Sequence, residues 1–149
     1  MTQEKKQFII GVGCQKGGTT WLYNQLVKSS EVDLGFIKEY HVFDALYVKE
    51  MQGFRHNYLQ LLANATLSGD PSSDLLKILS FYADTKNYFD YFDYLWYKGG
   101  NRITSVGDIT PSYSALPVNG FKKIKEQLES YGFDVKVIFL MRDPVERIW

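Results

Sequence analysis

The chain has 149 residues, one cysteine and two histidines, and its 17 basic and 17 acidic residues give a formal net charge of zero. This composition excludes an intrachain disulfide and offers neither the spacing of a metal site nor a general attraction for nucleic acid or an anionic membrane. We therefore expect a single domain over residues 1–149, with no metal, nucleic acid or membrane as partner and with any anion site confined to one place.

The N-terminal seven residues are polar, and the apolar run that follows them is too short to span a bilayer. We accordingly expect a soluble protein in the cytoplasm.

The first half of the chain predicts two strands and their connecting helices. Apolar residues 8–12 predict a buried strand, residues 19–28 the helix that follows it, and residues 32–37 a second strand. Residues 40–65 have mixed helical spacing, and residues 68–73 have the composition of a turn.

The second half continues the alternation. Residues 74–97 have helical spacing, residues 103–106 predict a strand that ends at Gly107, and residues 119–131 predict another helix. The continuous apolar run at residues 135–141 predicts a strand buried on both faces. Strands that alternate with helices predict an α/β fold with a mainly parallel sheet.

Aromatic residues are dense in the predicted helical region at 74–97. Because spacings of three and four recur among them, they favour packing in the core over a stacking wall for sugars. The aromatic residues concerned are Phe81, Tyr82, Tyr88, Phe89, Tyr91, Phe92, Tyr94, Trp96 and Tyr97. Cys14 has no evident base beside it, and we expect it to pack.

The strongest functional signal is residues 8–22, FIIGVGCQKGGTTWL, where an apolar strand runs into a glycine-rich turn and then a helix. Backbone N–H groups in such a turn and at the start of the helix converge on an anion, and Lys16 adds a full positive charge. This pattern predicts a site for a phosphorylated or sulfated cofactor.

The order of residues in this turn disfavours a standard triphosphate loop and does not match the dinucleotide fingerprint. The triphosphate motif G-x-x-x-x-G-K-[ST] places lysine directly before the hydroxyl residue, whereas here Gly17 and Gly18 separate Lys16 from Thr19. The dinucleotide fingerprint G-x-G-x-x-G is not met either, because Lys16 stands where the third glycine belongs.

Four segments resemble motifs of the sulfotransferases that use 3'-phosphoadenosine 5'-phosphosulfate (PAPS), in the family's order. Residues 16–22, KGGTTWL, are similar to the loop K-[SG]-G-T-[TS]-[WL]-L. Residues 38–44, KEYHVFD, and 107–113, GDITPSY, resemble K-E-x-H-[FY]-F-[DS] and G-E-K-[ST]-P-x-Y of the heparan-sulfate-modifying and related bacterial branch. Residues 137–147, VIFLMRDPVER, are similar to the strand and R-[ND]-P-x-x-R turn at the cofactor's 3'-phosphate.

The resemblance implies a P-loop-type three-layer α/β/α fold, with PAPS as cofactor and a hydroxyl, or second an amine, of a carbohydrate or small molecule as acceptor. It implies catalytic roles for Lys16, which would stabilise charge on the leaving phosphate, for Glu39 as general base, and for His41 beside it. The residues it implies for binding the cofactor are Lys16, Gly17, Gly18, Thr19, Thr20, Trp21 and Arg142, and those for binding the acceptor are Lys38, Asp108 and Tyr113.

The placement of these segments agrees with that function. Each follows the predicted end of a strand, and ligands of open α/β sheets bind beyond the carboxyl ends of the strands. We therefore expect one rim of the sheet to gather Lys16, Glu39, Asp108 and Arg142.

The sequence departs from the family pattern in two places. Asp108 and Ile109 stand where the branch usually has glutamate and lysine, so a role for that lysine is not carried over. The 3'-phosphate motif would continue beyond Trp149, and we expect the domain to be incomplete after this residue, as a truncated form, a fragment of a longer enzyme or a degenerate gene product.

Simpler interpretations stand beside these. Lys16 could be an exposed turn lysine, Glu39 a solvated carboxylate and His41 a structural histidine. Residues 108–113 could be a polar turn closed by proline, and Arg142 part of a common junction between strand and helix. The alternative functions are a phosphoryl-transfer enzyme of P-loop type and a non-catalytic nucleotide-binding or interaction fragment.

Overall fold

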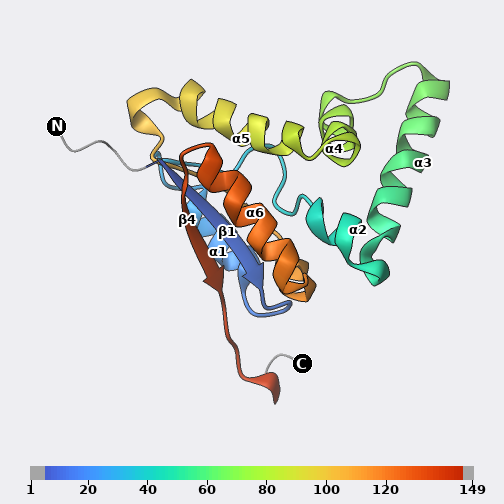
Figure 1. Cartoon of the computed structure of the whole chain (residues 1–149). Coiled ribbons are helices and arrows are strands. Elements are labelled where there is room, and N and C mark those ends of the chain that lie inside the picture. The colour runs from blue at the N-terminus through green and yellow to red at the C-terminus, as the bar shows by residue number, and fades with distance from the viewer. Residues whose placement is uncertain (1–5, 146–149) are drawn as a thin grey trace.

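Four strands form the centre of the molecule, which was analysed as a computed structural model that describes residues 6–145 (Figure 1). They are β1 (Gln7–Gly13), β2 (Val32–Asp33), β3 (Ser105–Ile109) and β4 (Asp134–Phe139). The strand order is β2-β3-β1-β4, and every pair is parallel. The prediction of an α/β fold with a parallel sheet is confirmed.

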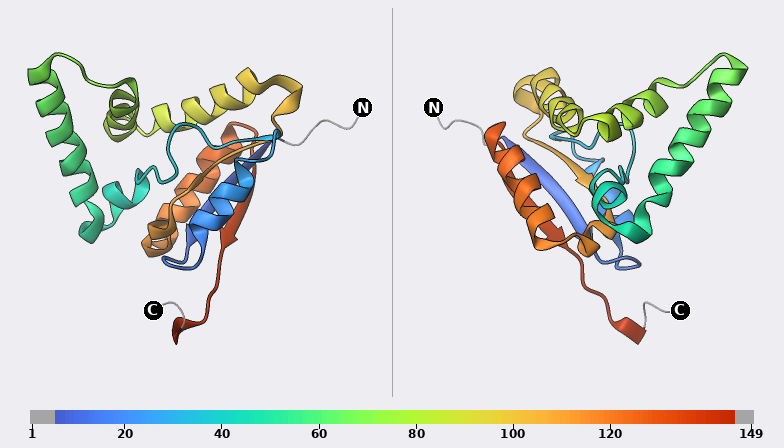
Figure 2. Two further views of the ribbon diagram at one scale, coloured as in Figure 1. Left: turned by 180° about the vertical axis from the view of Figure 1, so that it is seen from behind. Right: turned by 45° about the vertical axis from the view of Figure 1, so that its right-hand side comes forward.

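The helices lie on both sides of this sheet (Figures 1 and 2). In chain order they are α1 (Thr19–Leu26), α2 (Phe43–Tyr47), α3 (Gly53–Ser68), α4 (Ser73–Ala83), α5 (Lys86–Gly99) and α6 (Val118–Ser130). Three short 3₁₀ turns complete the described elements: η1 (Lys49–Met51), η2 (Gly100–Arg102) and η3 (Pro111–Ala115). No helix within residues 6–145 combines the length and apolar character needed to cross a bilayer.

The two faces of β1 bury two different apolar clusters, because successive side chains of a strand point in opposite directions. Phe8 and Ile10 belong to the larger cluster, which includes residues of α2, α4, α5 and α6. Ile9 belongs to a smaller cluster with Leu34 and Ile109, against which side chains of α1 pack. Phe8 is fully buried and makes edge-on ring contacts with Phe92, at 5.0 Å between centroids.

The aromatic residues of α4 and α5 mostly build the larger cluster. Phe81, Tyr82, Tyr88, Phe89 and Phe92 are all buried in it, which confirms the prediction of core packing for these five. Tyr94 and Tyr97, near the end of α5, differ, since they are 57% and 66% exposed, whereas Trp96 between them packs against the cluster.

Two predicted elements are shorter than expected, for local reasons. Only Val32–Asp33 of residues 32–37 is a strand, because the Asp33 carboxylate accepts from Gly35 N at 2.8 Å and Gly35 takes a φ of 76°, which turns the chain. The helical region 74–97 is two helices, because Asp84, the C-cap of α4, has an extended backbone, and its carboxylate accepts from Lys86 N at 2.9 Å in the turn before α5.

The prediction that residues 135–141 form a strand buried on both faces is wrong. The strand itself exists as β4, but within the described residues it is the edge of the sheet, where Val137 is 62% and Phe139 50% exposed. An apolar run alone does not distinguish a central strand from an edge strand.

Truncation of a fully buried side chain and of an exposed one in this sheet should lower stability by different amounts. We expect Phe8→Ala to lower the free energy of unfolding by about 3–5 kcal/mol, because it opens a cavity among rings that cannot collapse freely. Val137→Ala should cost less than about 1 kcal/mol, because the side chain is largely in water already. Urea unfolding at equilibrium measures both, and similar losses for the two variants would contradict this arrangement of the core.

Candidate functional site

A cavity of about 480 Å³ lies at the carboxyl edge of the parallel sheet and draws its lining from all four predicted segments. The lining residues are Gln15, Lys16, Gly18, Thr19, Thr20, Lys38, Glu39, Pro111 and Arg142. The expectation that one rim gathers Lys16, Glu39 and Arg142 is therefore confirmed, whereas Asp108 is not among the lining residues. Three of the lining side chains are cationic (Lys16, Lys38 and Arg142) and one is a carboxylate (Glu39), so an anion is favoured there.

The loop between β1 and α1 owes its shape to two glycines. Gly17 passes so close to the chain around it that an added Cβ would lie 2.7 Å from Cys14 Sγ and 3.0 Å from the Leu140 carbonyl oxygen. Gly18 takes a φ of 102°, a conformation that favours glycine, and stands at the N-cap of α1 without a capping side chain. The N–H groups of the first helical turn are thus left available beside the cavity.

Lys16 is the residue of this loop that carries strain. It has a φ of 60°, in the left-handed region that non-glycine residues rarely adopt, and its side chain is exposed at the cavity. Strain of this kind persists where the surrounding structure fixes the backbone, and it is concentrated at ligand sites. The loop therefore presents Lys16 to the cavity instead of leaving it on a relaxed turn.

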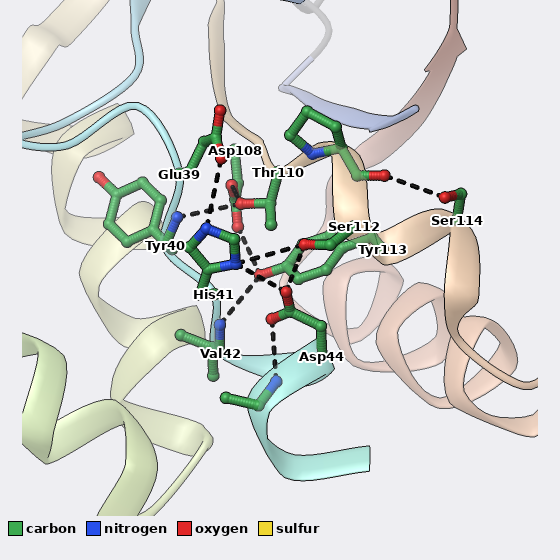
Figure 3. A network of polar contacts seen from close by, with 12 residues as sticks. Glu39, Tyr40, His41, Val42, Asp44, Asp108, Thr110, Ser112, Tyr113 and Ser114 are labelled. Atoms are coloured by element: carbon green, nitrogen blue, oxygen red, sulfur yellow. Dashed lines mark hydrogen bonds and ion pairs between the residues drawn. The ribbon is translucent and has the colours of Figure 1, made fainter. Parts of the chain in front are cut away.

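The segment at residues 38–44 places a chain of charges at the same cavity as this loop. Figure 3 shows three of its members, Glu39, His41 and Asp44. The Lys38 ammonium donates to the Glu39 carboxylate, and His41 Nε2 lies 3.3 Å from the other Glu39 oxygen. His41 Nδ1 lies 2.7 Å from Asp44 Oδ2, so the imidazole bridges two carboxylates. The ring also stacks on Phe54, with 3.7 Å between centroids and 10° between planes.

This bridge shifts the pKa values of both partners. A hydrogen bond from His41 lowers the pKa of Glu39 to about 2, helped against burial by the hydrogen bond and charge of Lys38. Burial opposes the charged form of His41, but its hydrogen bonds and attraction to Asp44 and Glu39 raise its pKa to about 9. At neutral pH the pair is an imidazolium and a carboxylate.

Two residues expected to contact the acceptor lie beneath the cavity instead. Asp108 and Tyr113 are fully buried, and the Tyr113 hydroxyl donates to Asp108 Oδ2 at 2.8 Å. Pro111 is the residue of this segment that reaches the cavity. The physical reason is that β3 is covered on both faces along its whole length, so Asp108 points into the core and satisfies its charge there.

The remaining predicted residues fall at the edge of the site or beyond it. Gly17 and Trp21 are not part of the described cavity lining, and the Trp21 side chain is 65% exposed. Arg142 lines the cavity, whereas Glu146 and Arg147, the end of the fourth motif, lie outside the described residues.

The structure adds residues that sequence reasoning did not single out. Asp44 is fully buried and accepts from the Ser112 hydroxyl as well as contacting His41. Asp44 closes the second motif, and its position three residues after His41 at the start of α2 was a usable signal. Ser112 and Phe54 gave no signal, because only the fold brings them to His41.

Comparison of the chain with protein-family models, with curated proteins and with solved structures finds no match. The site is therefore interpreted from its own geometry.

The imidazolium bridge predicts how stability depends on pH. Because the pKa of His41 is raised from 6.5 to about 9 by folding, its stabilisation is complete below pH 6.5 and is lost as pH rises through 9. Glu39 acts in a different window, since its lowered pKa gives stability that is lost only as pH falls from 4.5 toward 2. We expect the free energy of unfolding, measured with urea, to fall between pH 6.5 and 9.

His41→Gln should flatten this dependence, and His56→Gln is the matched control. His56 lies on the exposed surface of α3, away from both carboxylates of the bridge. A slope that is the same in His41→Gln and in the unmodified chain would contradict the bridge.

Proposed function

We propose that the chain is the cofactor-binding part of a PAPS-dependent sulfotransferase with a P-loop-type three-layer fold. It would transfer a sulfuryl group to a hydroxyl, or as second choice an amine, of a carbohydrate or small-molecule acceptor. The observation that carries the proposal is that one cavity collects Lys16 with its glycine loop, the Lys38–Glu39 pair and Arg142.

The donor set of the cavity fits this cofactor. PAPS carries anionic groups at its 5'-phosphosulfate and its 3'-phosphate, and the cavity supplies the cationic side chains of Lys16, Lys38 and Arg142. Thr19 and Thr20 add hydroxyl donors, and the first-turn N–H groups of α1 add backbone donors. The forked guanidinium of Arg142 suits a phosphate, and we assign it to the 3'-phosphate.

The chemistry that the bound cofactor supplies is a sulfuryl group whose bond to a phosphate oxygen breaks during transfer. Lys16 would stabilise the negative charge that grows on that oxygen, because its left-handed backbone conformation places it in the cavity lining. Glu39 would take the proton of the acceptor hydroxyl, since its carboxylate is ionised at neutral pH and lines the same cavity.

Lys38 gives Glu39 a means of becoming a stronger base. Its ammonium pairs with Glu39 and lines the cavity beside the other two cations. If Lys38 moved from Glu39 to an anion in the cavity, one of the interactions that lower the pKa of Glu39 would be removed. Cofactor binding would then prepare the base for the acceptor.

Binding of adenosine 3',5'-bisphosphate, the desulfated product, tests the cofactor site directly. We expect calorimetric binding that Lys16→Ala weakens by roughly 10- to 150-fold, the equivalent of a charged hydrogen bond of about 1.5–3 kcal/mol. Lys28→Ala, beyond the end of α1, is the matched control and should bind as the unmodified chain does. Preferential binding of ATP with magnesium would favour phosphoryl transfer instead.

Substitution of the proposed base separates binding from transfer. We expect Glu39→Gln to keep or increase affinity for the bisphosphate, because it removes the carboxylate that competes for Lys38, but to lower transfer of ³⁵S-sulfate from PAPS to a panel of mono- and disaccharides by roughly 10²–10⁴-fold. Glu50→Gln, an exposed glutamate in η1, is the matched control. Bisphosphate binding with no transfer in the unmodified chain would support a non-catalytic nucleotide-binding fragment.

A further inference from the structure

Two hydrogen bonds from main-chain N–H groups to side-chain hydroxyls hold the segment that carries Glu39 and His41. Tyr40 N donates to Thr110 Oγ1 at 3.0 Å, and Val42 N donates to the Tyr113 hydroxyl at 3.3 Å. The two amides flank His41, whose φ of 51° is in the left-handed region. A strained residue of this kind keeps its conformation only where its neighbours are fixed.

Both hydroxyls that accept these bonds donate to one buried carboxylate. Thr110 Oγ1 lies 2.6 Å from Asp108 Oδ1, and the Tyr113 hydroxyl lies 2.8 Å from Asp108 Oδ2. Each hydroxyl has a single proton, and once that proton is given to Asp108 the oxygen can only accept from the backbone. Asp108 therefore keeps each hydroxyl proton turned away from the segment, so that the oxygen is free to accept from the main-chain N–H group.

We propose that Asp108 is a positioning residue, which acts through Thr110 and Tyr113 to hold His41 in its strained conformation and so to aim Glu39 at the cavity. The role of Glu39 as a base rests on the function proposed above. The hydrogen bonds that connect Asp108 to His41, which we call the His41 clamp, do not depend on that function. Asp108 touches neither the cavity nor Glu39, and its influence passes entirely through the two hydroxyls and the main chain of residues 40–42.

The cost of burying the charge of Asp108 is consistent with a positioning role for this carboxylate. Burial raises the pKa of Asp108 to about 6, against the lowering effect of hydrogen bonds from Thr110, Tyr113 and Tyr88. Within residues 6–145 no cationic side chain pairs with it, so hydroxyl donors alone compensate its charge. An apolar residue would avoid this cost of burial but would leave the two hydroxyls without a fixed direction.

The chain contains a matched control for this network. Tyr88 on α5 is also fully buried and donates to the same oxygen, Asp108 Oδ2, at 2.9 Å. Among the described residues its hydroxyl makes no bond to residues 38–42. Tyr88→Phe and Tyr113→Phe therefore remove the same kind of bond from the same acceptor, but only Tyr113→Phe breaks the connection to His41.

The test is an NMR titration of the histidine ring signals in the ligand-free protein. We expect Tyr113→Phe to lower the pKa of His41 from about 9 toward its ordinary value, because the ring loses its fixed place between two carboxylates. Tyr88→Phe should leave the His41 curve unchanged. Thr110→Val, which breaks the other connection, should resemble Tyr113→Phe and replaces it if that variant does not fold.

Equal shifts in the two tyrosine variants, or no shift in Tyr113→Phe and Thr110→Val, would overturn the proposal. Bisphosphate binding, measured on the same samples, distinguishes the two proposals. If the pKa of His41 shifts selectively but the bisphosphate does not bind, the role of Asp108 is supported and the sulfotransferase function is not. If the bisphosphate binds but the pKa of His41 does not shift selectively, the function is supported and the role of Asp108 is not.

Discussion

Parallel pairing on both sides of β1 is the constraint on which the site depends. Ile10 is in register with Asp108 of β3 on one side and with Val137 of β4 on the other, so three strands end at nearly the same level. The segments that follow them must then meet at one edge of the sheet, although Lys16 precedes Pro111 by 95 and Arg142 by 126 residues in the chain. A single cavity lined by four distant segments is the direct result.

Beneath that edge, buried charge is compensated in two different ways. Asp44 faces an imidazolium and also accepts from Ser112 and from Ala45 N, whereas Asp108 is held by three hydroxyls. A buried carboxylate without such donors would cost several kcal/mol. Both carboxylates therefore fix the groups around them, and both sets of bonds converge on His41 and its flanking amides.

Local sequence patterns predicted the strands and the glycine loop. A short apolar run followed by a glycine-rich turn, such as the one at Lys16, is compatible with few structures other than a strand and a loop. They failed where long-range packing decides. The exposure of Val137 depends on which strand lies at the edge of the sheet, and the burial of Asp108 depends on Tyr88, twenty residues earlier. His41 could be singled out by its motif, but its stacking on Phe54 follows from the fold alone.

The local placement of charge explains how a chain without net charge can favour an anion at one site. The screening length is about 8 Å at physiological salt, so acidic residues elsewhere on the surface do not cancel the cations of the cavity. Glu39 is the acidic side chain within the described lining, and Lys38 already neutralises part of its charge. An arriving anion would compete with Glu39 for Lys38, while His41, fixed by its own hydrogen bonds, would keep the carboxylate in place. Under the proposed function, ligand affinity and the basicity of Glu39 would be coupled through one lysine.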